Sequence, residues 1–309
     1  MKKQIRRLLT VCGMAASLLL SAVTVSADEE PAADTSFDKY IAFGADLTEK
    51  EKNAVLNGFG ISSGEVSEYK TIEITNQEEH DYLGEYIDAS VIGTRALSSV
   101  MVVKTEEGSG IQVSTNNISY CTSGMYCNAL ATAGLTDAKV TVAAPFTISG
   151  TSALVGAMKA YATMTDQDIT ESTMDAATNE LVATADLGEK LGDKEKAAEL
   201  IAAVKQKVFT EELAEETDIR DAIDASARAL DLDISEESRD AIVDMMEKVS
   251  QVDIDVDAIT EQAKGIYDKL KEAGVDFGEV DTSGLFEQIG DFFAGIFEAI
   301  ADFFRGLFG

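Results

Sequence analysis

Hydrophobic and polar positions over residues 110–162 follow first the period of a strand and then that of a helix. Ile111 and Val113 alternate with polar neighbours, as in a half-buried strand. Apolar residues then recur at helical spacing up to Gly134, a residue type that commonly ends helices, and the two-residue period returns after it. A second helix is expected to begin near Ser149. This stretch therefore predicts strand, helix, strand and helix in turn.

Three segments before this stretch repeat the two patterns. KTIEIT at 70–75 predicts a strand, 76–91 predicts a helix with an apolar stripe, and 96–105 predicts another strand. The turn sequence EEGSG joins this last strand to the one at 110–115, so the two are expected to form a hairpin. The order of elements over 70–145 is that of the split βαβ, ferredoxin-like arrangement, with two helices on one face of an antiparallel sheet.

Short capping motifs predict where the first helices begin. Thr48 is followed three residues later by Glu51, which is the spacing of a capping box. Asn76 and Glu79 have the same spacing at the start of the next expected helix.

Beyond residue 162 the strand period is absent, and Ala, Glu, Asp and Lys dominate, which indicates a helical region. Gly188, Gly192 and Gly274 lie at or near expected helix ends. The helices are expected near 170–191, 193–208, 217–231, 235–251 and 256–273.

Residues 283–309 carry one uninterrupted apolar stripe at three- and four-residue steps, which predicts an amphipathic helix. Four acids and Arg305 occupy the other face, so an ordinary transmembrane span is excluded. The stripe could be covered by the preceding helices, by self-association or by an envelope surface. A membrane interface is disfavoured, because membrane-surface helices usually present Lys and Arg to lipid. The expected docking surface consists of Phe286, Phe292, Phe293, Phe297, Phe303, Phe304 and Phe308.

The first 27 residues have the pattern of a secretory signal peptide: four cations, an apolar run, and small residues ending at Ala27. A lipoprotein signal is not expected, since the residues before Cys12 are not small. Residues 28–36 are small and acidic and contain a proline, so a disordered lead-in is expected there.

The formal net charge of the chain is −31, and removal of four signal-peptide cations would make it −31 − 4 = −35. Such a surface repels polyanions, because nucleic acid and anionic headgroups are held mainly by Lys and Arg. Nucleic acid is therefore excluded as a partner. Divalent cations or a cationic wall component fit this charge better, although high acidity also serves solubility.

Two residue types are candidates for catalysis or cross-linking. His80, the one histidine of the chain, follows Glu78 and Glu79 at a helix start, where a solvated surface histidine is the expected outcome and neither a zinc site nor a triad is indicated. Cys121 and Cys127 are expected to form a disulfide if the protein is exported, with Thr122 or Ser123 capping the helix that carries Cys127.

Three further motifs could bind ions or ligands. Arg95 stands in an uncharged run and is expected to be an ion-pair partner. The alternating acids from Asp253 to Glu261 resemble a calcium loop but lack its glycine and its final glutamate, so no metal site is predicted. A loop that follows a strand and opens a helix could hold a carboxylate or phosphate, or could be a plain cap; it consists of Ser149, Gly150, Thr151 and Ser152.

Six runs of the sequence are distinctive: FGADLTEKEKNAVLNGFGI, ITNQEEHDYLGEYID, VIGTRALSSV, GIQVSTNNI, MYCNALATAGLTDAKVTVAAPFTISGTSALVGAMKAY and NELVATADLGEKLGD. They cover roughly residues 40–250, and in this order they resemble one protein family, the secreted YpuA-like family called domain of unknown function 1002. The resemblance implies an exported Gram-positive protein without an assigned activity.

Together these patterns predict an α+β protein: a ferredoxin-like split βαβ domain, then an all-helical region that ends in the amphipathic helix. The expected function is binding or assembly at the cell envelope without catalysis, and no cofactor is indicated. The alternative is an envelope hydrolase that uses two carboxylates in a cleft. The expected segments are a signal peptide (1–27), a lead-in (28–36), an α+β domain (37–165), a helical domain (166–275), and a hinge with the terminal helix (276–309).

Overall fold

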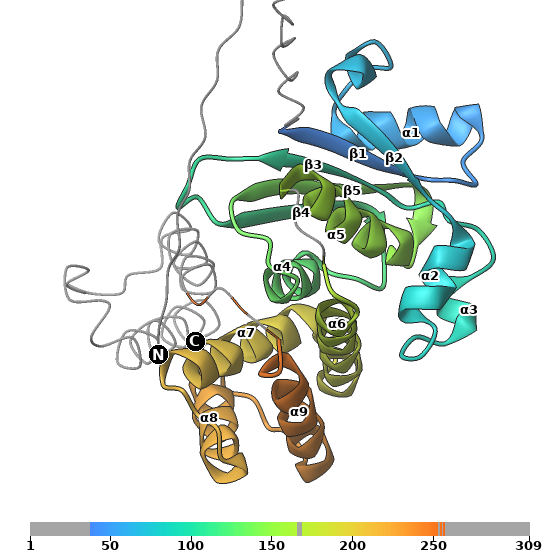
Figure 1. The fold of residues 1–309 in the computed structure, drawn as a ribbon. Helices are drawn as coiled ribbons and strands as arrows, with labels where there is room; N and C mark the ends of the chain where they lie inside the picture. The colour runs from blue at the N-terminus through green and yellow to red at the C-terminus, as the bar shows by residue number, and fades with distance from the viewer. Residues whose placement is uncertain (1–37, 166–168, 253, 255, 257–309) are drawn as a thin grey trace, which may run out of the picture. The chain divides into compact units, whose positions relative to one another are not determined.

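The computed structural model describes residues 38–165, 169–252, 254 and 256 (Figure 1). The described chain is an α+β fold: a five-stranded sheet with its helices, followed by a purely helical region. The strands are β1 (Lys39–Gly44), β2 (Lys70–Ile74), β3 (Ser99–Lys104), β4 (Ile111–Ile118) and β5 (Ala138–Ile148). The helices among them are α1 (Glu49–Phe59), α2 (Asn76–Leu83), α3 (Ala89–Ile92), α4 (Ser123–Thr132) and α5 (Thr151–Thr165), with a 3-10 turn at Glu65–Glu68.

The sheet differs from the ferredoxin-like arrangement that the sequence predicts. Its strand order is β2-β1-β3-β5-β4, and the β1–β2 and β4–β5 pairs are parallel, so the sheet is mixed. The predicted hairpin does not form, because β5 lies between β3 and β4. The burial of each strand accounts for this order. The inner half of β5 is buried on both faces, whereas the side chains of β4 alternate with exposed polar groups, as suits an edge.

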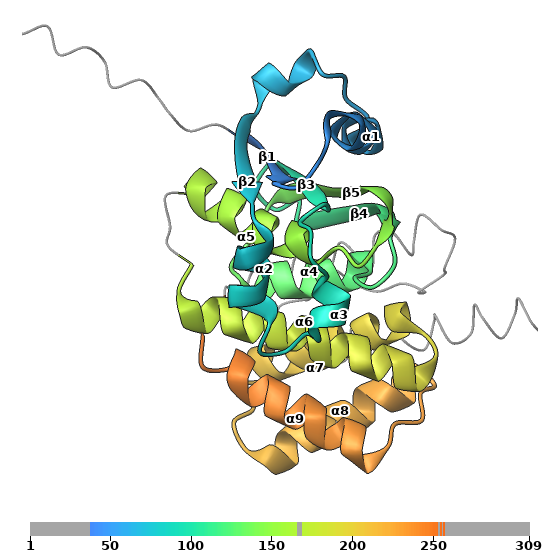
Figure 2. The same cartoon turned by 90° about the vertical axis from the view of Figure 1, so that its right-hand side faces the viewer.

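The sheet is covered on both faces. Helix α1 packs on one face, where Phe43 and Met101 meet Leu56 and Phe59. Helices α4 and α5 pack on the opposite face, so the sheet lies between two helical layers (Figure 2). Gly156 allows α5 to lie close to the sheet, because a Cβ added there would lie 2.8 Å from the Cβ of Ala42.

The predicted capping box is confirmed for α1, whereas the one at α2 begins one residue earlier than predicted. Thr48 and Glu51 form the predicted capping box. At α2, Thr75 and Glu78 form the box, not the predicted Asn76 and Glu79. The long helix expected over 76–91 is instead two short helices, because α2 ends at Leu83 and a new cap, Asp88, starts α3.

Four helices form the C-terminal part of the described chain and bury their own apolar cluster. The sequence predicts each of them within a few residues, because three begin at side-chain caps: Thr170, Asp193 and Ser235. The fifth predicted helix (256–273) and the terminal helix (283–309) lie outside the described residues. The four helices are α6 (Glu171–Leu191), α7 (Lys194–Thr210), α8 (Glu216–Ala229) and α9 (Glu236–Val249).

Candidate functional site

A buried carboxylate joins α2 to the start of α5. The Glu79 side chain is 1% exposed. Thr151 Oγ1 donates a hydrogen bond of 2.8 Å to one of its oxygens, and Asn76 Nδ2 donates one of 3.3 Å to the other. Glu79 is therefore fixed between two helices by groups from both.

Burial raises the pKa of Glu79 to about 7, from 4.5, because the charged form loses hydration. The negative charge of Asp46 raises this pKa further, whereas the Thr151 and Asn76 hydrogen bonds and nearby His80 oppose the shift. Such a shift is typical of functional acids. Here, however, the carboxyl group does not face solvent.

The candidate anion loop at 149–152 lies beside Glu79, and its hydroxyl groups form hydrogen bonds with other protein groups. Thr151 binds Glu79, Ser149 Oγ lies 3.2 Å from Thr151 Oγ1, and Ser152 Oγ lies 2.6 Å from Ser98 Oγ. Ser98 Oγ also accepts from the backbone N–H of residue 153, so it caps α5. The carboxylate that the loop meets in the described chain is that of Glu79.

His80 does not form a catalytic pair with a hydroxyl group in the described residues. Its Nε2 lies 3.1 Å from the Gly93 carbonyl oxygen, which can only accept, so Nε2 carries a proton. Asn76 Nδ2 donates to the same oxygen at 3.3 Å. The histidine thus helps to hold the loop after α3 against α2.

The predicted disulfide between Cys121 and Cys127 does not form in the structure. Thr122 caps α4 as predicted, which places Cys121 just before the helix and Cys127 inside it. The Cys127 thiol lies 3.6 Å from the Ile111 carbonyl oxygen. Cys121 is buried, with its thiol beside the Tyr126 hydroxyl, and burial raises its pKa to about 12. Both cysteines are thiols in the structure.

An open acidic groove lies on the surface next to buried Glu79, between α2, α5 and the start of α6. Its volume is about 600 Å³, and five of its twelve lining residues are acids, with Lys159 as its one cation. Tyr82 is 39% exposed in this groove, which is unusual for a large side chain in the described chain. The lining acids are Glu78, Asp81, Glu85, Glu171 and Asp175.

Part of the charge in the groove is already neutralised. Glu78 pairs with Lys159 and accepts a hydrogen bond from Thr75. Partial burial is the largest single influence on the Glu78 pKa and raises it, but the interactions with Lys159 and Thr75 together outweigh burial, so the pKa is lowered. Tyr86 Oη donates a 2.5 Å bond to Asp175. Lys248 from α9 donates to Tyr86 Oη at 2.9 Å, which links the groove to the last described helix.

Glu85 and Glu171 also line the groove, and neither side chain forms a hydrogen bond or ion pair with a described residue. The charge of Glu85 does act on Lys248, whose pKa it helps to raise. Carboxylates beside exposed tyrosine rings attract amines and guanidinium groups, both through charge and through cation–π contact. No three His, Cys, Asp or Glu side chains are grouped to hold a metal ion within the described ranges. The alternating acids from Asp253 to Glu261 all lie outside the described residues.

Neither the buried acid nor the groove is predicted by the sequence patterns. The spacing of Asn76 and Glu79 indicates a helix cap for Glu79, and Tyr82 and Tyr86 fall in the expected apolar stripe of the helix. A usable signal was the four-residue spacing of Glu79 and Leu83, which places the carboxylate on the same face of α2 as a buried leucine. Arg95, in contrast, behaves as predicted: its Nη2 lies 2.9 Å from Glu51 Oε2 and 2.7 Å from the Asp46 carbonyl oxygen.

The family resemblance is confirmed by comparison with known proteins. A family model described as "Protein of unknown function (DUF1002)" matches residues 43–266. The chain belongs to the DUF1002 family. It is 38% identical over 281 residues to "Uncharacterized protein YpuA" of Bacillus subtilis (strain 168), an alignment that covers 90% of this chain and 92% of that protein.

No solved structure matches this DUF1002 chain. Within the part of the chain that the structure describes, none of the helices combines the length and the apolar character needed to cross a bilayer.

Proposed function

We propose that this DUF1002 protein is an exported, non-enzymatic binding module of the Gram-positive cell envelope, and that its acidic groove binds a cationic ligand. The observation that carries the proposal is the groove itself. It combines Glu85 and Glu171, which have no ion-pair partner among the described residues, with the exposed ring of Tyr82 in a groove of about 600 Å³. This is the chemistry that recognises amines and guanidinium groups.

The alternative, a hydrolase with two carboxylates, has less support. That mechanism needs an acid with a raised pKa and a second carboxylate facing one cleft. Glu79 has a pKa raised to about 7 but is 1% exposed, and both its oxygens are hydrogen-bonded inside the protein. Glu78, which does line the groove, has a lowered pKa and is paired with Lys159.

Export and envelope location are supported by the N-terminal sequence, which has the pattern of a cleavable signal peptide. The charge of the chain favours positively charged wall or peptide groups over polyanions. The proposed ligand is therefore a chain or surface that displays several amines.

Titration of the purified protein with a fluorescent decalysine peptide tests the groove. We expect binding that weakens as salt rises, and a loss of at least fivefold in affinity for the double variant Glu85→Gln/Glu171→Gln. The matched control is Glu106→Gln/Glu107→Gln, which removes the same charge from an exposed turn after β3. Tyr82→Ala is expected to weaken binding without changing the charge.

Equal losses in the two charge-matched double variants would show that the peptide binds the overall negative surface, and would reject the groove. Fractionation of cells into medium, wall and membrane tests the location. Retention of the protein in the cytoplasm would reject the envelope role.

A further inference from the structure

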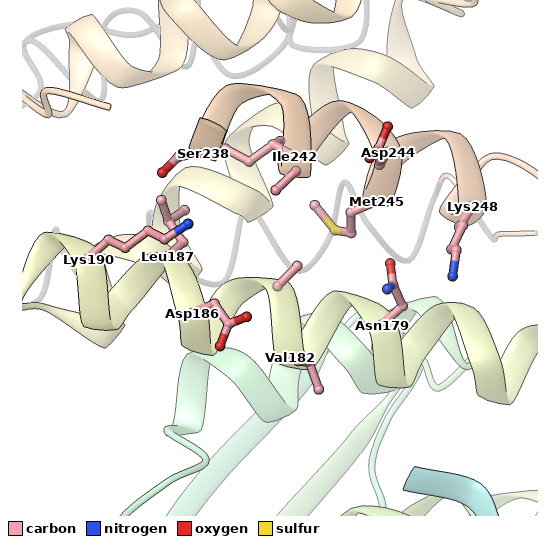
Figure 3. Close-up of a pocket in the computed structure, with 12 residues that line it drawn as sticks. Asn179, Val182, Asp186, Leu187, Lys190, Ser238, Ile242, Asp244, Met245 and Lys248 are labelled. Atoms are coloured by element: carbon pink, nitrogen blue, oxygen red, sulfur yellow. The ribbon is translucent and has the colours of Figure 1, made fainter. Parts of the chain in front are cut away.

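Tyr86 and Asp175 hold the side chain of Lys248 beside the acidic groove. Both residues line the groove, whereas Lys248 belongs to the last turn of α9 and extends from that helix toward α6 (Figure 3). Its Nζ donates a 2.9 Å hydrogen bond to Tyr86 Oη and lies 4.8 Å from the centre of the Tyr86 ring. Tyr86 in turn donates to Asp175 Oδ1 at 2.5 Å. One ammonium group thus meets an aromatic ring, a hydroxyl oxygen and a nearby carboxylate.

These surroundings favour a positively charged amine. The hydrogen bond to Tyr86 is the main cause of the raised pKa of Lys248, and the charges of Asp175 and Glu85 act in the same direction. Partial burial of Lys248 lowers this pKa but does not outweigh them. Because ring, hydroxyl and carboxylates all favour the charged form, the place has the chemistry of a site for an alkylammonium group.

Lys248 fills this place incompletely. Its Nζ lies 4.0 Å from Asp175 Oδ2, at the limit of an ion pair, and both side chains are 41% exposed. Within the described part of the chain, no group donates a hydrogen bond to Asp175 Oδ2. Exposed pairs of this kind are weak and are screened by salt. An amine that is not tethered to α9 can approach the same carboxylate at hydrogen-bond distance, so it can compete with Lys248.

We propose that Tyr86 and Asp175 form a binding site for a primary alkylammonium group, and that Lys248 of the same chain fills the site until a ligand amine displaces it. The inference rests on the proposed function and names one place in the groove where the cationic ligand is held. Glu171, which also lines the groove, precedes Asp175 by four residues on α6, so their Cβ atoms lie about 6 Å apart on one helix face. The ligand is therefore expected to carry at least two amines, one for each carboxylate.

Titration of the full-length protein with the fluorescent decalysine peptide, at about 0.15 M salt, tests the site. The variant Lys248→Ala removes the competing ammonium group, and we expect the peptide to bind this variant at least threefold more tightly than wild type. An unchanged or weaker affinity would contradict the displacement of Lys248.

The matched control is Lys190→Ala, which removes the same charge and also leaves an acid, Glu237, without its lysine. Lys190 lies at the opposite end of the α6–α9 pair from Lys248 (Figure 3). It follows Asp175 by 15 residues on α6, about 22 Å along the helix, which exceeds two Debye lengths of about 8 Å. Its removal should change the affinity by less than 1.5-fold. An equal gain for the two lysine variants would overturn the proposal.

A second pair of variants separates the site from the overall charge. In an Asp175→Asn protein, the further change Lys248→Ala should raise the affinity by less than 1.5-fold, because the carboxylate that the ligand amine would take is absent. The same gain with and without the Asp175 carboxylate would show that Lys248 acts through overall charge alone, and would reject the site.

Failure of the site and failure of the groove give different results. Binding to wild type that Lys248→Ala leaves unchanged would reject the site at Tyr86 and Asp175, while the groove would stand. Absence of binding to both proteins would reject the site and the groove together. Binding to Lys248→Ala alone would support the site, and would show that Lys248 closes it in the wild-type protein.

Discussion

Lys205 on α7 donates a 2.7 Å hydrogen bond to Glu180 on α6, and both side chains are shielded from solvent, at 1% and 0% exposed. The ammonium group also donates to the Asn128 carbonyl oxygen and to Thr132 Oγ1, and Thr132 donates to the second carboxylate oxygen. The pair thereby connects α4, which covers the sheet, to the helical region. All three ammonium protons are used, so the buried charge is fully satisfied.

Replacement of one partner of this pair should strongly destabilise the protein. Lys205→Met is expected to lower the free energy of unfolding by about 3–5 kcal/mol, because Glu180 would remain buried without its cation. The double variant Glu180→Leu/Lys205→Met should recover most of that loss. Urea denaturation measures both. Lys190→Met, which breaks the exposed pair with Glu237, is the control and should cost less than about 1 kcal/mol. A single variant as stable as this control would contradict the role of the network.

Glu79 should make the protein less stable as pH rises. Its pKa of about 7 in the folded protein exceeds the ordinary value of 4.5, so between these values the folded state holds a proton that the unfolded state has lost. Stability from this group is complete below pH 4.5 and is lost as pH rises through 7. A shift of this size corresponds to about 3 kcal/mol.

The variant Glu79→Gln should flatten this part of the pH profile, as measured by urea denaturation from pH 5 to pH 8. Glu85→Gln, which changes an acid in the open groove, should keep the wild-type slope. Parallel slopes for wild type and Glu79→Gln would mean that Glu79 is already ionised in the folded protein at pH 5.

Gly156 should not tolerate a methyl group, although alanine favours helices. The added Cβ would lie 2.8 Å from Ala42 Cβ and 3.2 Å from Val100 Cγ1. Overpacking costs about 1–3 kcal/mol, which should outweigh the helix-propensity gain of about 1 kcal/mol. Gly156→Ala should therefore lower the thermal midpoint. Gly64→Ala, where the nearest atom is 3.9 Å away, should change stability by less than about 0.5 kcal/mol. An unchanged midpoint for Gly156→Ala would show that α5 moves away from the sheet at little cost.

The two cysteines near α4 should differ in reactivity. In a Cys127→Ser variant, Cys121 should resist iodoacetamide until the protein is unfolded, because it is 2% exposed and its pKa is raised to about 12. In a Cys121→Ser variant, the half-buried Cys127 should react in the folded protein. Mass spectrometry counts the added groups. Wild-type protein that accepts label at these two positions only after reduction would instead establish the disulfide.

The features that could be predicted from the sequence are mostly local. Thr48 with Glu51 and Thr122 before α4 determine helix starts by contacts within one turn, so a short motif suffices. Strand pairing is not local. The segment KYIAFG shows no alternation, because β1 is buried on both faces, and without this strand the order of the sheet could not be derived.

The buried Lys205–Glu180 pair also depends on contacts between distant segments, but the sequence does indicate that Lys205 is buried. Lys205 lies four residues after Ile201 and three before Val208, so it falls on the apolar face of its helix. A lysine in that position requires a buried partner. Its identity as Glu180 depends on how two helices cross, and the sequence pattern of each helix alone does not contain that information.

The position of β3 in the centre of the sheet constrains the order in which the protein can fold. Val100 pairs with Ala42 on one side and with Val142 on the other, so both neighbours come from distant parts of the chain. Contacts of this kind are slow to form, because a long loop must close before they contribute. A growing polypeptide cannot complete the sheet until β5 has been synthesised. Until then the apolar side chains and unpaired edges of β1 and β3 stay exposed, and the nascent chain is prone to aggregation.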